Sequence, residues 1–244
     1  MRALHLVNLA SGPAALFVPP LERLGFVVDD VNPNDEPLPR TLEGYDAVLV
    51  CGGTANTHET DRYPWLEHER ELLVEALDRG VPTIGLCLGA QLLTQAAGGT
   101  VYRTAPAEVG WREVDVDPAA ARDPVLGAMP GQFMALQWHY YGCELPDQAV
   151  ELARNTVCPQ AFRIGEAAWG TQFHIEVTRD ILLDWEREGR EDLERQGIDH
   201  DRFLRDLDQY LPPHEAIGSD MARRFAELAL ARAQAAGVRP SSAA

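Results

Sequence analysis

A strand, a tight turn and a helix follow one another without a break between residues 81 and 97. The apolar run at 82–86 predicts a strand, and the periodicity at 90–97 predicts a helix. The turn between them reads Gly85-Leu86-Cys87-Leu88-Gly89, and its glycines permit a strained conformation that projects the cysteine from the strand's end. The sequence therefore predicts an α/β fold with Cys87 at the C-terminal edge of a central strand, where open α/β sheets bind ligands.

The rest of the first hundred residues alternates apolar runs with helical patterns. Apolar residues recur at helical spacing from Trp65 to Leu77 and predict a helix that ends at Gly80. Three further strands are predicted at 2–8, 26–29 and 47–51. This alternation is typical of a mostly parallel, flavodoxin-like central sheet that is flanked by helices.

The pattern changes after residue 100. Short strands are predicted at 113–116, 132–137, 150–153 and 168–173, which indicates a smaller antiparallel or mixed sheet portion. Helices are predicted at 179–196, 201–210 and 213–235; their interleaved charges are typical of solvated faces, with a docking surface or lid as the alternative. We therefore expect one domain at 1–178, a C-terminal helical extension packed on it at 179–236, and a flexible tail at 237–244.

The charged residues exclude several classes of function. With 21 basic and 38 acidic residues, the formal net charge of −17 repels nucleic-acid phosphates and anionic lipid headgroups. All 21 basic residues are arginine, which excludes Schiff-base and pyridoxal chemistry and lysine-containing phosphate loops. No apolar run approaches the roughly 18 residues of a membrane span. Together with the negative charge, this leads us to expect neither nucleic-acid nor membrane binding.

The cysteines and histidines carry no metal signature. Too few for a disulfide framework, and without CxxC spacing, the cysteines indicate a reducing, cytoplasmic location; they are Cys51, Cys87, Cys143 and Cys158. Four histidines lack HExxH or paired-ligand spacing; they are His58, His68, His200 and His214. We therefore expect no metal and no cofactor.

A nucleophilic cysteine needs a base and a group that orients the base, and the segment Gln172-Phe173-His174-Ile175-Glu176 contains both. Residues i and i+2 of a strand share one face, so His174 and Glu176 can point toward Cys87 together. His174 would take the thiol proton, and Glu176 would hold the imidazole. An inert buried cysteine and a solvated His–Glu pair are the ordinary alternatives, but each part supplies what the other lacks, so together they predict a Cys–His–Glu triad.

These stretches resemble the class I, triad-type glutamine amidotransferases, and above all stand-alone members related to the glutaminase part of GMP synthase. The resemblance rests on the Cys87 turn with Gln91 four residues on, on Gly52-Gly53 and on the segment 172–177. Supporting stretches lie at 108–111, 138–139, 145–146, 152–153 and 158–162. Together the motifs cover roughly residues 47 to 178.

The resemblance implies both a reaction and a site. Cys87 would attack the side-chain amide carbon of glutamine, ammonia would leave, and water would hydrolyse the γ-glutamyl thioester. Leu88 and Gly53 would offer backbone N–H groups to the oxyanion at both steps. The candidate substrate-binding residues are Gln91, Gly52, Trp138, His139 and Tyr140.

Two positions depart from the family pattern. Ile175 stands where the family usually has proline between histidine and glutamate; since it keeps the extended geometry, the triad should survive. Tyr140 and Tyr141 follow His139, where relatives commonly carry Gly-Asp or Gly-Phe. Two bulky tyrosines would narrow the glutamine pocket or reshape it for a different γ-glutamyl group. His139 itself is either a second candidate base or a structural histidine.

Three functions remain open. The first is a glutamine amidohydrolase that supplies a separate synthetase or acceptor subunit, because the chain has no ATP-binding signature. The second is a γ-glutamyl peptidase, hydrolase or transferase that acts on γ-glutamyl conjugates. The third is a non-catalytic, amidotransferase-like regulatory subunit. A homodimer is expected only because symmetric dimers are common among enzymes.

Overall fold

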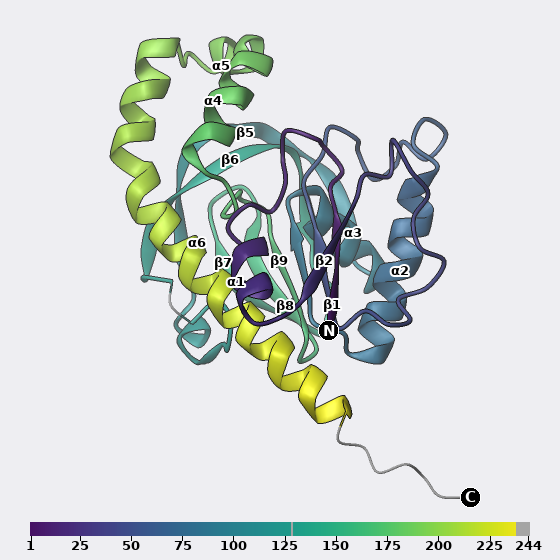
Figure 1. The fold of residues 1–244 in the computed structure, drawn as a ribbon. Coiled ribbons are helices and arrows are strands. Elements are labelled where there is room, and N and C mark those ends of the chain that lie inside the picture. Colours follow the sequence, from purple (N-terminus) through teal and green to yellow (C-terminus); the bar gives the residue numbers. More distant parts are fainter. Residues whose placement is uncertain (128, 238–244) are drawn as a thin grey trace, which may run out of the picture.

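The computed structural model describes residues 1–127 and 129–237, so residues 238–244 of the predicted tail lie outside the described residues. Within them, a nine-stranded sheet has the order β2-β1-β3-β4-β9-β8-β7-β5-β6 (Figure 1). The parallel strands are β1 (Arg2–Leu6), β2 (Val27–Val31), β3 (Ala47–Val50), β4 (Thr83–Leu86) and β9 (Ala168–Thr171). The antiparallel ones are β5 (Thr100–Val116), β6 (Gln132–Glu144), β7 (Ala149–Arg154) and β8 (Pro159–Ile164). The predicted fold class is confirmed.

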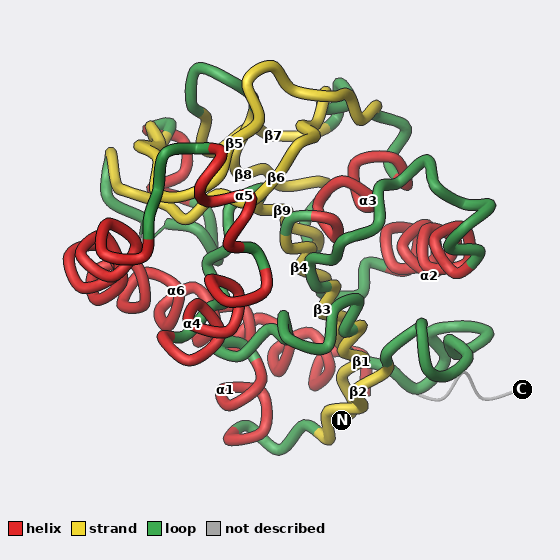
Figure 2. Tube along the Cα trace, turned by 90° about the horizontal axis from the view of Figure 1, so that it is seen from above, coloured by secondary structure: helices red, strands yellow, loops and turns green. Residues whose placement is uncertain are grey.

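Helices cover both faces of the parallel half (Figures 1 and 2). One face carries α2 (Trp65–Arg79) and α3 (Leu88–Ala96), and the other carries α1 (Val18–Arg23) and the C-terminal part of α6 (His200–Gly237). In β3, Ala47 and Leu49 join the core beneath α1 and α6, whereas Val48 and Val50 join the core beneath α2 and α3. Because successive strand residues point to opposite faces, a strand covered on both sides is apolar throughout.

The antiparallel half differs from the prediction in two places. β5 and β6 form one long hairpin instead of short separate strands, and a register shift between Arg103 and Glu108 hides its periodicity. β8 was not predicted, although it pairs with both β7 and β9. Most of its side chains are buried, so it lacks the apolar–polar alternation by which a half-exposed strand is recognised. A short 3₁₀ helix, Pro118–Arg122, precedes β6.

The C-terminal helices also differ from the prediction. The region 179–196 forms two helices, α4 (Arg179–Glu188) and α5 (Arg190–Arg195), with Gly189 between them. A Cβ on Gly189 would lie 2.3 Å from Cζ2 of Trp138, so a larger residue there would displace the Trp138 ring. In contrast, α6 continues through Pro212 and Pro213, where two helices were predicted. Buried side chains on both sides of the prolines hold α6 together despite the two missing N–H donors.

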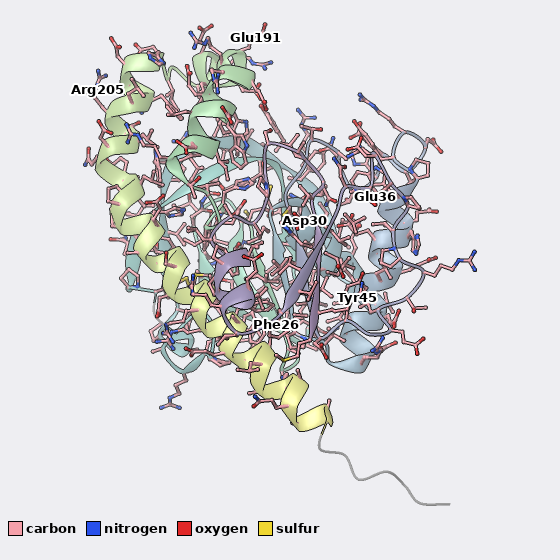
Figure 3. All side chains as sticks on the ribbon, in the orientation of Figure 1. Phe26, Asp30, Glu36, Tyr45, Glu191 and Arg205 are labelled. Carbon is pink, nitrogen blue, oxygen red and sulfur yellow. The ribbon has the colours of Figure 1, made fainter. Side chains whose placement is uncertain are left out.

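These helices share cores with the sheet. The helices α4, α5 and the first half of α6 bury Leu182, Leu193 and Leu207 against Val109 and Leu136 of the long hairpin. Figure 3 labels Glu191 and Arg205 at this end of the molecule. The domain division at residue 178 stays a prediction. Among the described residues, no helix is both long and apolar enough to cross a membrane.

Candidate active site

Cys87 occupies the turn between β4 and α3 with φ of 52° and ψ of −102°. Such a conformation costs a non-glycine residue about 1–3 kcal/mol. The flanking glycines serve close packing instead of supplying the positive φ. A Cβ on Gly85 would lie 2.5 Å from the carbonyl oxygen of Gly89, and one on Gly89 would lie 2.2 Å from that of Val50. The predicted turn is present, but the strain resides on the cysteine, and the glycines let α3 approach β3 and β4.

His174 and Glu176 lie beside Cys87, but not on a strand as predicted. β9 ends at Thr171, and both residues belong to the irregular segment that follows. Nδ1 of His174 lies 2.7 Å from Oε1 of Glu176. A Cβ on Gly52 would lie 3.0 Å from Cε1 of His174 and 3.5 Å from Cβ of Cys87, so the Gly52 turn leaves room for both side chains. The structure thus brings together a thiol, an imidazole and a carboxylate.

The electrostatics of this group favour a charged imidazole. Burial alone would lower the pKa of His174, but the Glu176 carboxylate and the hydrogen-bonded Cys87 outweigh burial and raise it to about 10. The side chains of His174 and Glu176 are almost fully buried, so water screens the interaction between them little. Oε2 of Glu176 has no hydrogen-bond partner among the described residues, which leaves its interaction with His174 dominant.

A cavity of about 360 Å³ adjoins Cys87. Nine of the ten residues predicted for the site line it; they are Cys87, His174, Gly53, Leu88, Gln91, Gly52, Trp138, His139 and Tyr140. Glu176, the tenth, lies behind His174 and reaches the cavity only through it. The structure therefore gathers all ten predicted residues at one place.

Gln172 contacts the sulfur atom although the sequence indicated no role for it. Its Nε2 lies 3.6 Å from Sγ of Cys87, and its Oε1 lies 3.3 Å from Nε2 of Gln91. The same nitrogen of Gln91 donates to the carbonyl oxygen of Tyr141 at 3.2 Å. Gln172 opens the segment 172–177 on which the family resemblance rests, and it lies two residues before His174, but neither signal showed that its side chain reaches Cys87.

The C-terminal helices form one wall of the cavity, which the charge pattern did not reveal. Trp185, Glu188 and Asp192 line it from α4 and α5. The Trp185 ring meets the His174 ring edge-on at 4.8 Å between centroids, and its Nε1 donates to the carbonyl oxygen of Ser11 at 2.8 Å. Part of this predicted solvated face therefore borders the site.

His214 of α6 is a second residue that sequence reasoning missed. Its Nε2 lies 2.7 Å from the carbonyl oxygen of His174, and its ring packs edge-on against Trp111. Burial lowers the pKa of His214 to about 4, so the ring stays neutral at neutral pH. Four residues on, a Cβ on Gly218 would lie 2.3 Å from the carbonyl oxygen of Ile175. The helix α6 thus packs directly on the segment that carries His174.

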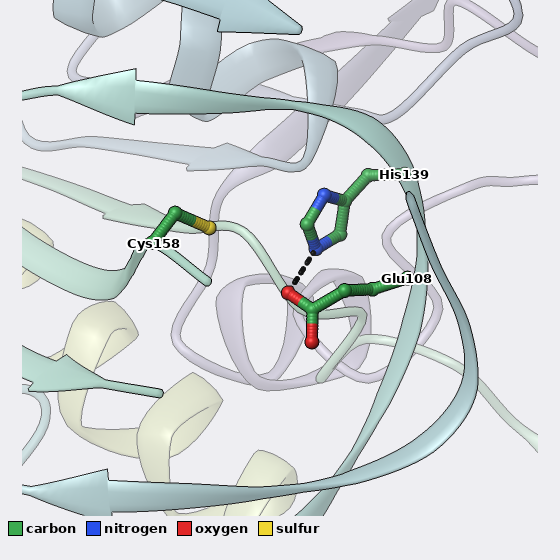
Figure 4. A group of neighbouring side chains, drawn as sticks. All are labelled: Glu108, His139 and Cys158. Carbon is green, nitrogen blue, oxygen red and sulfur yellow. Dashed lines mark ion pairs between the residues drawn. The ribbon is translucent and has the colours of Figure 1, made fainter. Parts of the chain in front are cut away.

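His139 is paired with a carboxylate that the sequence did not connect to it. Its Nε2 lies 3.3 Å from Oε2 of Glu108, and Cys158 lies beside the pair (Figure 4). Zinc takes this donor set, but the Glu108 oxygens already accept hydrogen bonds from Asn155 and Gln160. Burial, and then Glu108, raise the pKa of the Cys158 thiol far above its ordinary value. The three residues therefore fit a hydrogen-bonded cluster better than a metal site.

A second group of a cysteine, a histidine and a carboxylate, here Cys51, His5 and Asp30, lies near the end of β1. Nε2 of His5 lies 3.2 Å from Sγ of Cys51, and its Nδ1 lies 2.8 Å from Oδ1 of Asp30. No substrate can reach this group, because Cys51 is fully buried and the Ala14 N–H already donates to Nε2 of His5. Burial raises the pKa of the Cys51 thiol well above its ordinary value. Of the four cysteines, Cys87 is the one that lines the cavity.

Comparison with known proteins identifies the family. The family model for glutamine amidotransferase class-I matches residues 18–181. The chain belongs to the class I glutamine amidotransferase family. The resemblance inferred from the motifs is therefore confirmed.

Individual relatives span the chain to different extents. The glutamine amidotransferase-like protein YfeJ of Salmonella typhimurium is 27% identical over 205 residues, which cover 82% of this chain and 84% of YfeJ. The glutamine-hydrolyzing GMP synthase of Aeropyrum pernix is 30% identical over 157 residues, which cover 62% of this chain but only 28% of that longer protein. A solved glutamine amidotransferase from Thermotoga maritima superposes with a TM-score of 0.82 and 27% identity, covering 94% of this chain and 98% of its own. The likeness extends beyond the motifs to nearly the whole fold.

Proposed function

We propose that this amidotransferase hydrolyses the side-chain amide of glutamine through a γ-glutamyl thioester on Cys87. The observation that carries the proposal is the meeting of Cys87, His174 and Glu176 at one cavity, from two segments far apart in the chain. Family membership supports glutamine amide hydrolysis in general terms.

The proposed proton transfers run through His174. His174 takes the thiol proton first, and the sulfur anion of Cys87 then forms a bond to the amide carbon. The carbon–nitrogen bond then breaks, and His174 passes the proton to the leaving ammonia. Water attacks the thioester, its proton goes to His174 and then back to the sulfur, and glutamate leaves. The raised pKa of His174 supports its charged form in these steps, with Glu176 as the opposing charge.

Leu88 and Gly53 are the proposed oxyanion donors. Both line the cavity, and a Cβ on Gly53 would lie 3.0 Å from Cβ of Asn8 and 3.1 Å from Cδ2 of Leu88. The Asn8 amide donates to the carbonyl oxygen of Cys51 at 3.1 Å, so the segment that follows β1 holds the start of the Gly52-Gly53 turn. A side chain at position 53 would therefore displace the Gly53 backbone N–H from the position in which it is proposed to donate to the oxyanion.

The predicted substrate-binding residues fall into two groups. Gly52, Trp138 and Tyr140 present surface to the cavity. Both hydrogen bonds of the Gln91 amide nitrogen go to the protein, which leaves its Oε1 as the atom proposed to meet the substrate. The His139 ring has protein partners on both nitrogens, so substrate contact is proposed through its backbone and not its imidazole.

The aromatic wall favours a second candidate, a hydrolase or transferase for γ-glutamyl conjugates. Trp138, Tyr140, Tyr141 and Trp185 all line the cavity. Aromatic surface of this extent suits a leaving group larger than ammonia. This candidate keeps the same nucleophile and changes only the amine that departs.

The test is release of ammonia and glutamate from glutamine, alongside a panel of γ-glutamyl amides and peptides. Turnover of glutamine by the native protein, its loss in Cys87→Ala and its retention in Cys51→Ala would support the proposal. Cys51→Ala is a matched control because it removes a fully buried thiol that does not line the cavity. Preference for larger γ-glutamyl compounds would favour the second candidate. An unreactive Cys87 would favour a non-catalytic subunit.

A separate synthetase or acceptor subunit is proposed as the partner. The GMP synthase relative is a longer protein, of which this chain matches 28%. An isolated chain would then hydrolyse glutamine slowly and be accelerated by its partner. A homodimer stays a prediction.

A further inference from the structure

The reacting sulfur has a polar neighbour besides His174. Nε2 of Gln172 lies 3.6 Å from Sγ of Cys87, which is within range for an N–H···S hydrogen bond. Gln172 is 1% exposed, so this amide exchanges no partner with bulk water. A buried N–H donor aimed at sulfur interacts more strongly with a thiolate than with a thiol.

The direction of the Gln172 amide follows from groups that cannot reverse. The backbone carbonyl of Tyr141 only accepts hydrogen bonds, so Gln91 must turn its NH₂ group toward it. The same NH₂ group faces Oε1 of Gln172 at 3.3 Å. Gln172 must therefore turn its own NH₂ group toward Cys87, because the reversed amide would set two donors face to face.

The Tyr141 carbonyl is itself held by the buried cluster of Figure 4. Nδ1 of His139 lies 3.0 Å from this carbonyl oxygen, and Nε2 lies 3.0 Å from Oε1 of Gln137 and 3.3 Å from Oε2 of Glu108. All three partners are hydrogen-bond acceptors, so the ring is held between the Tyr141 carbonyl on one side and the Gln137 and Glu108 oxygens on the other. Gln160 donates to Glu108 and accepts from Gln137, which fixes the amide of Gln137 as well.

We propose that the Gln172 carboxamide donates a hydrogen bond to the sulfur of Cys87 and stabilises its thiolate, with its direction set by the Tyr141 carbonyl through Gln91 and that carbonyl held in place by the Glu108–His139 pair. Gln172 is then a catalytic residue, because it touches the reacting atom. Glu108 and His139 are positioning residues. The proposal rests on Cys87 being the nucleophile, as in the proposed function.

The other titratable groups that face the sulfur are few in the described part of the chain. His174 approaches it from the segment after β9, with Glu176 behind it. Cys143 of β6 lies 3.9 Å from Oε1 of Gln172, and burial raises the pKa of that thiol to about 12, so it stays neutral through the neutral range. A shift in thiolate formation after a change at Gln172 can therefore be separated from a change at Cys143.

The first test measures the rate of Cys87 alkylation by iodoacetamide against pH in the full chain, with mass spectrometry to identify the modified cysteine. Gln172→Met keeps the length and removes the donor, and Gln172→Glu replaces the donor with a carboxylate. We expect the acid-side midpoint of alkylation to rise by about one pH unit in Gln172→Met and by more in Gln172→Glu. Glu108→Gln should shift it in the same direction by less.

Glu69→Gln is the matched control, because it changes another fully buried carboxyl whose hydrogen-bond partner is Asn8. Its alkylation midpoint should equal that of the unaltered protein. An unchanged midpoint in folded Gln172→Met and Gln172→Glu would overturn the proposal, because a merely structural glutamine would not alter thiolate formation.

A second measurement needs no variant of Gln172. The side-chain NH₂ resonances of Gln172 in the unaltered protein should titrate with the alkylation midpoint and stay flat over the same range in Cys87→Ala. Resonances that do not respond to Cys87 would overturn the proposal even if the Gln172 variants fail to fold. A normal titration with no turnover of glutamine would instead count against the proposed function alone and support the Gln172 contact.

Discussion

Replacing Glu69 by glutamine should stabilise the folded protein, and the gain should grow with pH. Glu69 lies on α2 and is fully buried, with a single hydrogen bond from Nδ2 of Asn8 at 3.0 Å. Its Oε2 has no partner among the described residues. Burial raises the pKa of this carboxyl from 4.5 to about 8, and the Asn8 hydrogen bond only partly opposes the rise. Glu69 is therefore protonated in the folded protein at neutral pH.

The size of the effect follows from the two pKa values. Below pH 4.5 the carboxyl is protonated in both the folded and the unfolded chain, so glutamine and glutamic acid should be nearly equivalent. Between pH 4.5 and about 8, folding must take up one proton, which costs about 1.4 kcal/mol per pH unit. The difference should reach about 3 kcal/mol at pH 7 and stop growing above pH 8.

Urea unfolding followed by tryptophan fluorescence at pH 5, 6, 7, 8 and 9 measures this difference directly. Glu71→Gln is the matched control, because it alters an exposed carboxylate on the same helix and should change the unfolding free energy little at any pH. The titration of His174 affects both proteins equally and cancels in the comparison. A gain that is the same at pH 5 and pH 8, or a loss at both, would refute a neutral buried Glu69.

Three further outcomes are expected. Glu176→Gln should lower kcat for glutamine by about three orders of magnitude with little change in KM, since the amide no longer stabilises a charged His174; an undiminished kcat would exclude Glu176 from the mechanism. The pKa of about 10 for His174 means that its ion pair stabilises the fold fully below pH 6.5 and is lost as pH rises through 10. The free energy of unfolding should therefore fall across that window, and Glu176→Gln should flatten the fall. Gly189→Ala sets a Cβ 2.3 Å from the Trp138 ring and should raise KM several-fold, whereas Gly131→Ala, with open space around it, should not; equal KM values would show that the turn is not part of the pocket.

The parallel half of the fold was predictable because its signals are local. Each strand there is a short apolar run, and the helix ending at Gly80 has regular periodicity and a left-handed glycine at its end. The hairpin of β5 and β6 and the strand β8 were not predictable in the same way. A register shift interrupts one, and burial on both faces removes the alternation of the other.

The residues of the candidate site were likewise predictable only where the signal is local. The sequence predicted the residues that lie in short motifs, because the chemistry of such a motif can be inferred from adjacent residues. These are Cys87, His174, Glu176 and the Gly52-Gly53 turn. The strand assignment of His174 and Glu176 was wrong, because the chain leaves β9 before reaching them. Their contact survives since the irregular segment keeps the imidazole and carboxylate in reach of one another.

By itself, the sequence determined the nucleophile turn, the family and the mostly parallel sheet, because these depend on residues within a few positions of each other. Only the tertiary structure decided that Trp185 packs on His174, that His214 holds the His174 backbone, and that Gln172 reaches the sulfur of Cys87. Those contacts join residues from separate elements: the Trp185 and His214 contacts form only when α4 and α6 pack against the sheet, and the Gln172 contact forms only when β9 pairs with β4. Local propensity carries no information on such distances, because they are set by the burial of whole helix faces.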